Sequence, residues 1–221
     1  PNRKIFVTTA SGLDFNDGLG YSIVRLNLDT LAIEDSWKVT AQDSTWDADW
    51  GSSPTLFYDR NGRELVGAGH KDGHYYAFDR SNLAQGPVWI ATVAQQGEVP
   101  QDGDGTLSTA AFDGARLYVG GGTPPDTADP YAHGTVVAVD TTNGSILWRQ
   151  NFPGPVIAPV STVNGVVFAA GGNLVEAIEG ATGKVLWSYR TDAGLYGGIA
   201  IAGDTIYIGD LSGKIYAFRV V

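Results

Sequence analysis

The chain has 221 residues, with 30 glycines, no cysteine and a formal net charge of −10. The negative charge argues against a nucleic-acid partner, because the phosphates would repel this chain. The sequence contains no run of about 18 apolar residues, so it predicts no membrane-spanning helix. A negative surface suits a cation, a cationic substrate or a basic electron-transfer partner, although most such surfaces only keep a protein in solution. Glycine is at roughly twice its usual share, and short Val/Ile/Tyr/Phe runs lie between Gly, Asp and Asn, so we predict an all-β protein with tight turns.

A repeated pattern runs along the chain. It consists of a strand, an acidic residue, a turn often closed by glycine, and a strand that carries Trp. In chain order the copies are 22–37, 75–89, 136–148 and 174–187, and a fifth begins at 215–218. Later copies are preceded by a small-residue strand, a turn and a strand ending in glycine, as in Pro159–Val163, Asn164-Gly165 and Val166–Gly172. Asn-Gly between alternating apolar runs is typical of a hairpin.

Four strands in each repeat of about 40 to 50 residues predict a β-propeller of four-stranded antiparallel blades. Lys4–Ala10 fits the second strand of a blade and Ile215–Val220 the third strand of another. The chain would then hold about 18 strands, or about four and a half blades. An open arc exposes sheet edges, which proteins normally cover. We therefore expect residues 1–221 to be one partial domain of a propeller with about seven or eight blades, completed by upstream blades or by a second chain.

The repeat Ala-Thr-Gly-Lys-Val-Leu-Trp at 181–187 resembles that of the pyrroloquinoline quinone (PQQ) propeller proteins. The ending Gly-Lys-Ile-Tyr-Ala-Phe at 213–218 is similar too. Within that group the chain looks most like the C-terminal half of polyvinyl-alcohol-dehydrogenase-like quinoproteins, from about Lys4 to Phe218. The motif is specific for the blade, but non-enzymatic scaffold propellers share it. The resemblance therefore implies the fold and leaves two kinds of function open.

One segment departs from the blade pattern, Trp46-Asp47-Ala48-Asp49-Trp50. It precedes an expected innermost strand (about Ser53–Tyr58), where the loops of a propeller face its central funnel. In extended backbone, residues i and i+2 point to the same side, so Asp47 and Asp49 could both bind one hard cation. Alternatively, repulsion or burial could raise the pKa of one carboxyl and make it a proton acceptor. A solvated turn that caps a strand would show the same residues.

A second candidate is Lys71, in the tight hairpin 67–73. It follows Asp47 by one inner hairpin, so its ammonium could reach the same funnel, although Lys-Asp-Gly is also an ordinary hairpin sequence. His70, His74 and His133 are too scattered to predict a three-histidine metal site, and we expect surface or loop roles for them.

The family resemblance assigns roles to these residues. It implies that Asp47 is the catalytic base and lies near the metal, Ca²⁺ or a lanthanide. It makes Asp49 an additional metal ligand, of the kind found in the lanthanide-using branch of the family. It places Trp46 and Lys71 at the cofactor PQQ, where the Lys71 ammonium would polarise the ortho-quinone. The implied reaction removes the alcohol proton to Asp47 and transfers hydride to PQQ.

Three positions depart from the family pattern. Ser11 stands where an Asn metal ligand is usual, although the nearby Asp14 or Asn16 could replace it. Leu107 stands about where family members often have Trp, and Thr123 lies where an Asn often contacts the cofactor.

Two functions therefore remain open. Asp47, Asp49 and Lys71 favour a PQQ- and metal-dependent oxidoreductase for alcohols or polyols. The departures favour a non-enzymatic propeller that serves as a binding or scaffold module. For the enzyme, the resemblance implies a cytochrome c as electron acceptor. For either function it implies a periplasmic or secreted location.

Overall fold

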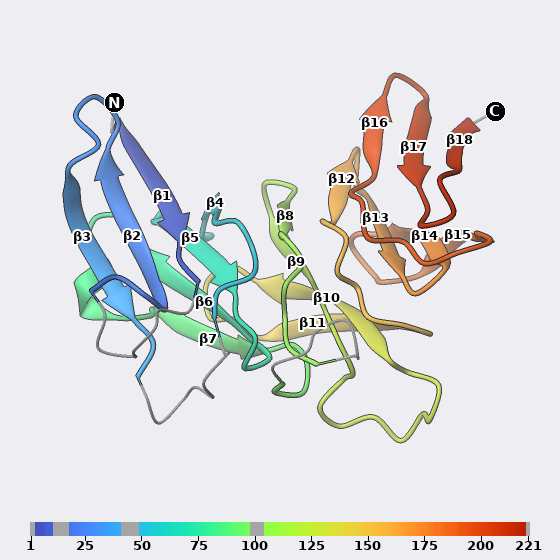
Figure 1. Ribbon diagram of the computed structural model, residues 1–221, viewed down its shortest axis with the longest axis horizontal. Coiled ribbons are helices and arrows are strands. Elements are labelled where there is room, and N and C mark those ends of the chain that lie inside the picture. The colour runs from blue at the N-terminus through green and yellow to red at the C-terminus, as the bar shows by residue number, and fades with distance from the viewer. Residues whose placement is uncertain (1–2, 11–17, 41–48, 98–103, 220–221) are drawn as a thin grey trace.

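The computed structural model describes residues 3–10, 18–40, 49–97 and 104–219 and is built almost entirely from strands (Figure 1). The first sheet contains β1 (Lys4–Thr8), β2 (Ser22–Asn27) and β3 (Ile33–Lys38). The second contains β4 (Thr55–Tyr58), β5 (Glu64–Gly69), β6 (His74–Asp79) and β7 (Trp89–Thr92). The third contains β8 (Ala111–Phe112), β9 (Arg116–Gly121), β10 (Gly134–Asp140) and β11 (Ile146–Phe152). The fourth contains β12 (Ser161–Val163), β13 (Val166–Gly171), β14 (Leu174–Glu179) and β15 (Val185–Arg190). The fifth contains β16 (Ala200–Ala202), β17 (Thr205–Gly209) and β18 (Ile215–Arg219).

Every sheet is an antiparallel meander whose strands pair in chain order. Figure 1 shows the sheets following one another across the molecule, from β1–β3 at one end to β16–β18 at the other. This arrangement confirms the predicted all-β propeller and its 18 strands within the described residues. The short 3₁₀ helix η1 (Leu83–Gln85) interrupts the second blade. No helix in the described part of the chain is long and apolar enough to cross a membrane.

The strand positions within the blades also match the prediction. Among the described strands β1 pairs with β2 alone, and Trp37 lies in the outermost strand β3, so β1 occupies the second position of its blade. The turn at Asn164 and Gly165 has φ values of 50° and 78°, as a two-residue hairpin between β12 and β13 requires. β12 begins at Ser161 rather than at the predicted Pro159, because proline has no N–H to donate and the Val160 amide donates to the Thr109 carbonyl rather than to β13.

Hydrophobic side chains fill the spaces between neighbouring blades. One buried cluster lies at each of the four interfaces, and the clusters include in turn Ile23, Phe57, Phe152 and Leu195. These four side chains are at most 1% exposed. A single four-stranded sheet cannot cover both of its faces, so each blade depends on its neighbours for burial.

The repeated tryptophans join one blade to the next. The Trp89 indole donates a 2.9 Å hydrogen bond to the Thr141 carbonyl of the third blade. Trp148 does the same to the Gly180 carbonyl of the fourth blade, also at 2.9 Å. Each ring packs over the glycine that closes the receiving turn; a Cβ on Gly183 would lie 2.8 Å from the Trp148 ring. The Trp-and-glycine repeat is thus an interlocking contact between blades.

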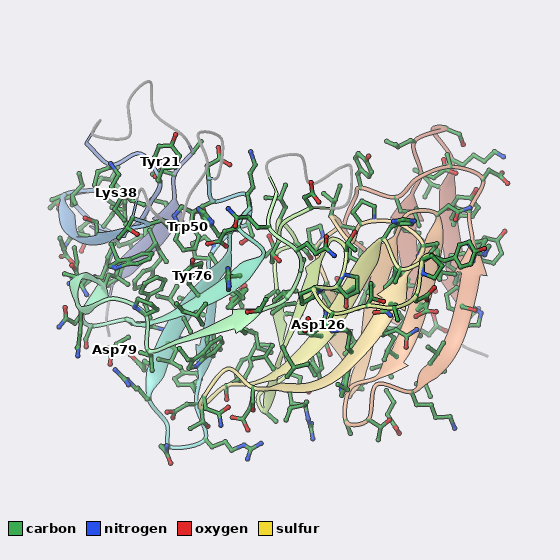
Figure 2. The ribbon with its side chains drawn as sticks, turned by 90° about the horizontal axis from the view of Figure 1, so that it is seen from below. Tyr21, Lys38, Trp50, Tyr76, Asp79 and Asp126 are labelled. Carbon is green, nitrogen blue, oxygen red and sulfur yellow. The ribbon has the colours of Figure 1, made fainter. Side chains whose placement is uncertain are left out.

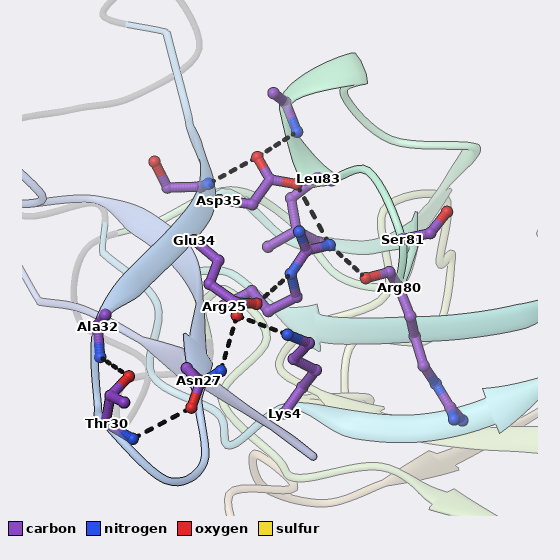
Figure 3. Close-up of polar contacts among 12 residues, drawn as sticks. Lys4, Arg25, Asn27, Thr30, Ala32, Glu34, Asp35, Arg80, Ser81 and Leu83 are labelled. Carbon is purple, nitrogen blue, oxygen red and sulfur yellow. Dashed lines mark hydrogen bonds and ion pairs between the residues drawn. The ribbon is translucent and has the colours of Figure 1, made fainter. Parts of the chain in front are cut away.

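Polar contacts join the first and second blades (Figure 3). Arg25 on β2 donates a 2.7 Å hydrogen bond to the Arg80 carbonyl. The Asp35 carboxylate on β3 accepts hydrogen bonds from the Leu83 and Ala84 amides of η1, at 2.7 and 3.2 Å. The first blade is therefore held against the second on its outer side as well as through its hydrophobic cluster.

Candidate functional site

Backbone pairing brings two loops of the second blade together. In an antiparallel meander, the entry to the first strand and the turn between the second and third strands lie at the same end of the strands. We call that end of a blade its loop edge. Here these are segment 49–54 and hairpin 70–73. Trp50 forms a single antiparallel bridge with His70, and the Lys71 amide donates a 3.2 Å hydrogen bond to the Asp49 carbonyl. Asp49 and Lys71 therefore lie opposite one another.

The side chains of Asp49 and Lys71 form an ion pair. Lys71 Nζ lies 3.0 Å from Asp49 Oδ1, and the two side chains are only 13% and 12% exposed. Water and salt screen such a shielded pair less than they screen a surface pair. The structure thus places one ammonium and one carboxylate, in contact, at the loop edge of the second blade.

Ser52 holds the Asp49 segment against its surroundings. Its Oγ accepts a 2.7 Å hydrogen bond from the Gly69 amide and donates one of 3.2 Å to the Gly69 carbonyl. Its carbonyl accepts a 2.8 Å bond from the Thr8 hydroxyl at the end of β1. The segment that carries Asp49 is therefore tied to both the first and the second blade.

Backbone hydrogen bonds between loops hold the Lys71 hairpin in place. The Gly97 amide donates a 3.1 Å bond to the Lys71 carbonyl, and the Gly122 amide donates a 2.9 Å bond to the Gly105 carbonyl. Gly105 has a φ of 70°, and a Cβ there would lie 2.6 Å from the Lys71 carbonyl oxygen. The Lys71 backbone is thus fixed by loops of both the second and the third blade.

A charged network lies directly beside Lys71. The Asp72 carboxylate accepts a 2.9 Å hydrogen bond from the His74 amide and another from the Tyr76 hydroxyl, and His70 Nδ1 lies 3.2 Å from Asp72 Oδ1. Burial alone would raise the pKa of Asp72, but the contacts with His70, His74 and Tyr76 outweigh it and hold that pKa well below its usual range. Asp72 is therefore an anchored anion that fixes the hairpin turn.

Aromatic rings pack beneath the two loops. Trp50 contacts His70 and Tyr76, with ring centroids 4.9 and 5.4 Å apart, and Figure 2 shows Trp50 beside Tyr76. His70 lies in the hairpin, which agrees with the expected surface or loop role, but it is fully buried. Trp50 Nε1, His70 Nε2 and Thr106 Oγ1 are buried without hydrogen-bond partners. A single bridge pair leaves no periodic pattern in the sequence, and for this reason the burial of His70 was not predicted.

Several predicted site residues lie outside the described residues, namely Ser11, Asp14, Asn16, Trp46 and Asp47. Within the described ranges, no three His, Cys, Asp or Glu side chains gather in a way that could hold a metal ion. Asp49 does supply the oxygen donor that a hard cation takes, and Lys71 supplies a cation for a negatively charged oxygen.

Two of the residues that depart from the family pattern, Leu107 and Thr123, lie in the loops next to segment 49–54 and hairpin 70–73, which together we call the loop layer. Leu107 packs tightly on Gly51, where a Cβ would come within 1.7 Å of Leu107 Cδ2. The Thr123 carbonyl accepts a 2.8 Å hydrogen bond from the Gln95 amide. Leu107 therefore fills space next to the Asp49 segment, and the backbone of Thr123 helps to join the loops of two blades.

Solved structures share this fold. A europium-containing methanol dehydrogenase is 17% identical with a TM-score of 0.66, over 97% of this chain and 48% of its own. BamB from Moraxella catarrhalis is 16% identical with a TM-score of 0.64, over 98% of this chain and 59% of its own. At these identities the likeness establishes the propeller fold. The chain spans about half the length of these two proteins.

Sequence comparison identifies the family. A polyvinylalcohol dehydrogenase of Pseudomonas sp is 30% identical over 161 residues, which are 68% of this chain and 24% of that protein. The chain thus spans about a quarter of that relative's length. The family model described as outer membrane protein assembly factor BamB, a model of PQQ-type repeats, matches residues 71–220. This chain therefore belongs to the family of PQQ-type β-propellers.

Proposed function

We propose that the chain forms part of a PQQ- and metal-dependent oxidoreductase that acts on alcohols or polyols. The observation that carries this proposal is the shielded ion pair of Asp49 and Lys71 at the loop edge of the second blade. The similarity to the Pseudomonas polyvinylalcohol dehydrogenase supports it. The backbone bonds to Gly97 and Asp49 hold the Lys71 hairpin before any ligand arrives, which lowers the cost of binding.

Each residue has a distinct role in this proposal. The Lys71 ammonium holds a negatively charged oxygen and stabilises the charge that develops there. Asp49 offers oxygen to Ca²⁺ or a lanthanide ion, together with Asp47 and Ser11, and Trp46 lies against the cofactor. Asp47 accepts the proton of the substrate hydroxyl as general base. PQQ, when bound, supplies the acceptor for the hydride that leaves the alcohol carbon.

The proposal includes further partners. The matches cover 24%, 48% and 59% of the three relatives described above, so we propose that residues 1–221 form one partial domain of a propeller of about seven or eight blades, completed by other blades or by a second chain. The net charge of −10 suits a basic electron acceptor such as a cytochrome c. A periplasmic or secreted location fits such an electron-transfer chain.

The test uses the full-length protein, reconstituted with PQQ and with Ca²⁺ or a lanthanide, and follows dye reduction by alcohols. Asp47→Ala should lower kcat by about 10²- to 10⁴-fold, the usual contribution of a general base. Lys71→Ala should lower kcat by about 10²-fold. Lys214→Ala, which removes an exposed ion pair with Asp192 in the fifth blade, should match the wild type. No PQQ binding and no dye reduction by the wild type would reject the assignment.

A second candidate function is a binding or scaffold module without cofactor. The match to the BamB family model over residues 71–220 favours it, as do Leu107 and Thr123 in the loop layer. This function predicts that the folded full-length protein retains no PQQ in equilibrium dialysis, at any Ca²⁺ or lanthanide concentration. PQQ retention that depends on Lys71 would exclude it.

A further inference from the structure

We propose that the third blade carries a binding pocket for a neutral polyhydroxyl chain, between the end of β11 and the loop that joins β9 and β10. The residues that line this pocket are distinct from Asp49 and Lys71, so the inference goes beyond the proposed function and does not rest on it. It follows from a fixed guanidinium that faces a carboxylate across open space without pairing with it.

The pocket lies where a long loop meets the outermost strand of the blade. The loop 122–133 joins β9 and β10 and projects from the third blade at its loop edge (Figure 1). β11 ends at the same edge, because it runs antiparallel to β10. Residues 124–129 of the loop, together with Arg149 and Asn151 of β11, line a pocket of about 340 Å³. Pockets that bind small molecules have volumes of roughly 300–1,000 Å³, so this one is large enough for a short ligand segment.

Arg149 uses one part of its guanidinium to hold itself in place and leaves the other part for a ligand. Its Nη1 donates hydrogen bonds of 2.7 Å to the Val93 carbonyl and 2.9 Å to Thr135 Oγ1. Its Nε and Nη2 have no hydrogen-bond partner among the described residues. A guanidinium stays protonated at any ordinary pH. The pocket therefore contains a fixed positive charge with N–H groups to donate.

Asp126 faces this guanidinium without closing on it. Burial lowers the pKa of Arg149, and the negative charge of Asp126 acts in the opposite direction, which shows that the two groups sense each other. Among the ion pairs of the described ranges, however, none joins Asp126 to Arg149. The space between them suits a group that accepts a hydrogen bond from the guanidinium and donates one to the carboxylate. A hydroxyl group does both.

The side chain of Asn151 adds a neutral polar group to the pocket. Residues two apart on a strand point to the same side, so Asn151 and Arg149 share one face of β11. Asn151 Oδ1 is buried and has no hydrogen-bond partner in the part of the chain that the structure describes. A buried oxygen without a partner costs free energy, which a hydroxyl of a ligand would recover. Asn151 thus favours a ligand that can donate.

The wall formed by the loop is held in place before any ligand arrives. The Pro124 carbonyl accepts a 3.3 Å hydrogen bond from Gln95 Nε2 of the second blade. The Asp129 amide donates a 3.1 Å bond to Thr127 Oγ1, and Asp129 Oδ1 accepts one of 2.9 Å from the Tyr131 amide. A pocket whose wall is already ordered loses less entropy when a ligand binds.

The charges of the pocket select the class of ligand. An anion would be attracted by Arg149 but repelled by Asp126 and Asp129. A metal ion would be repelled by the guanidinium, and within the described ranges no three acidic or histidine side chains gather to hold one. A neutral chain of hydroxyl-bearing carbons satisfies donors and acceptors alike, and the prolines at 124 and 125 offer an apolar surface to its carbon atoms.

The experiment measures the binding of sorbitol, a linear neutral polyol, to the full-length protein without PQQ or added metal. Saturation-transfer NMR titration suits the expected Kd, which lies in the millimolar range because each hydrogen bond to the ligand replaces one to water. Asp126→Ala should weaken binding about fivefold or more, since it removes a charged acceptor. Asp204→Ala, which removes an exposed carboxylate of the fifth blade, should match the wild type. Lys71→Ala should leave this binding unchanged, which separates the pocket from the proposed active site.

Three results would overturn the proposal. The first is no sorbitol binding by the wild type, and the second is equal binding by the wild type and Asp126→Ala. The third is binding of the zwitterion glycine that depends on Asp126 while sorbitol does not bind, because the pocket would then hold an ammonium and a carboxylate. Arg149→Lys with a native circular dichroism spectrum should also bind sorbitol more weakly, and an unchanged affinity would contradict the role of the guanidinium. PQQ binding is measured separately, so the proposed function stands whichever result is found.

Discussion

Glu176 is a buried carboxyl group whose replacement should stabilise the protein at alkaline pH. It lies on β14 between Leu174 and Ile178, which share its face and pack in the cluster between the third and fourth blades. The residue is 6% exposed and its Oε2 has no hydrogen-bond partner. Burial raises the pKa of Glu176 from 4.5 to about 7, although the positive charge of Arg190 acts in the opposite direction.

The sign of the effect follows from linkage. Between pH 4.5 and about 7 the folded state binds more protons at Glu176 than the unfolded state does, so stability falls as the pH rises through this range. At about 1.36 kcal/mol for each pH unit, the full loss would be about 3 kcal/mol. The pKa of about 7 already includes the effect of Arg190, and a further discount for screening by solvent gives an expected loss of about 1–2 kcal/mol. Glu176→Gln, which is neutral and similar in shape, should recover that amount at pH 8 and little at pH 4.

The assay is urea unfolding followed by tryptophan fluorescence, at pH values from 4 to 9. Glu64→Gln serves as the control, since the Glu64 side chain is 48% exposed and its ion pair with Arg80 is long, at 4.0 Å. That control should change stability by less than about 1 kcal/mol at every pH. A gain for Glu176→Gln that is equal at pH 4 and pH 8, or no gain at pH 8, would refute the reasoning.

Three further predictions concern the contacts between and within blades, and each is read from the same urea midpoints. Gly183→Ala should destabilise the protein by about 2 kcal/mol or more, because its Cβ would strike the Trp148 ring at 2.8 Å and its φ is 78°. Gly213→Ala, with a φ of 84° but nothing within 4 Å of its Cβ, should cost only about 1 kcal/mol; equal costs would contradict the interlocking contact. Trp148→Phe should cost about 1–3 kcal/mol for the lost 2.9 Å bond to the Gly180 carbonyl and for the smaller ring, and a neutral result would show that the bond adds nothing. Tyr118→Phe should cost about 1–2 kcal/mol, because its hydroxyl donates a 2.6 Å bond to Asp113, and an unchanged midpoint would argue that water replaces that bond.

The fold could be predicted from the sequence because each blade carries its own local signals. The Asn164-Gly165 turn is specified by the two residues themselves. The Trp recurs at the same place in the repeat, in the outermost strand of successive blades. The start of β12 was predicted two residues early, since an apolar run alone does not show where hydrogen bonding begins. Turn and strand residues were therefore enough to predict the order of the strands, whereas the first residue of β12 depends on which backbone N–H groups donate to the neighbouring strand.

The candidate site could be predicted only in part. The spacing of Asp47 and Lys71, one inner hairpin apart, indicated that Lys71 could reach the funnel expected for the Asp47 and Asp49 segment, and Lys71 Nζ lies 3.0 Å from Asp49 Oδ1. The bridge between Trp50 and His70 was not predictable, because it is one isolated pair with no alternation around it. That bridge buries His70, and it shows that contacts between loops depend on the whole fold rather than on any pattern within one segment.

The backbone bonds that join Gly97 to Lys71 and Gly122 to Gly105 have a consequence for how this protein can change over evolutionary time. Because the donors and acceptors are main-chain atoms, most side-chain substitutions in these loops leave the hydrogen bonds intact. Gly105 is the exception, because a Cβ there would strike the Lys71 carbonyl oxygen. Residues that face a ligand can therefore diverge while the platform beneath them keeps its shape. Such main-chain bonds also let the side chains at the tips of these loops be replaced one at a time without rebuilding the backbone that carries them.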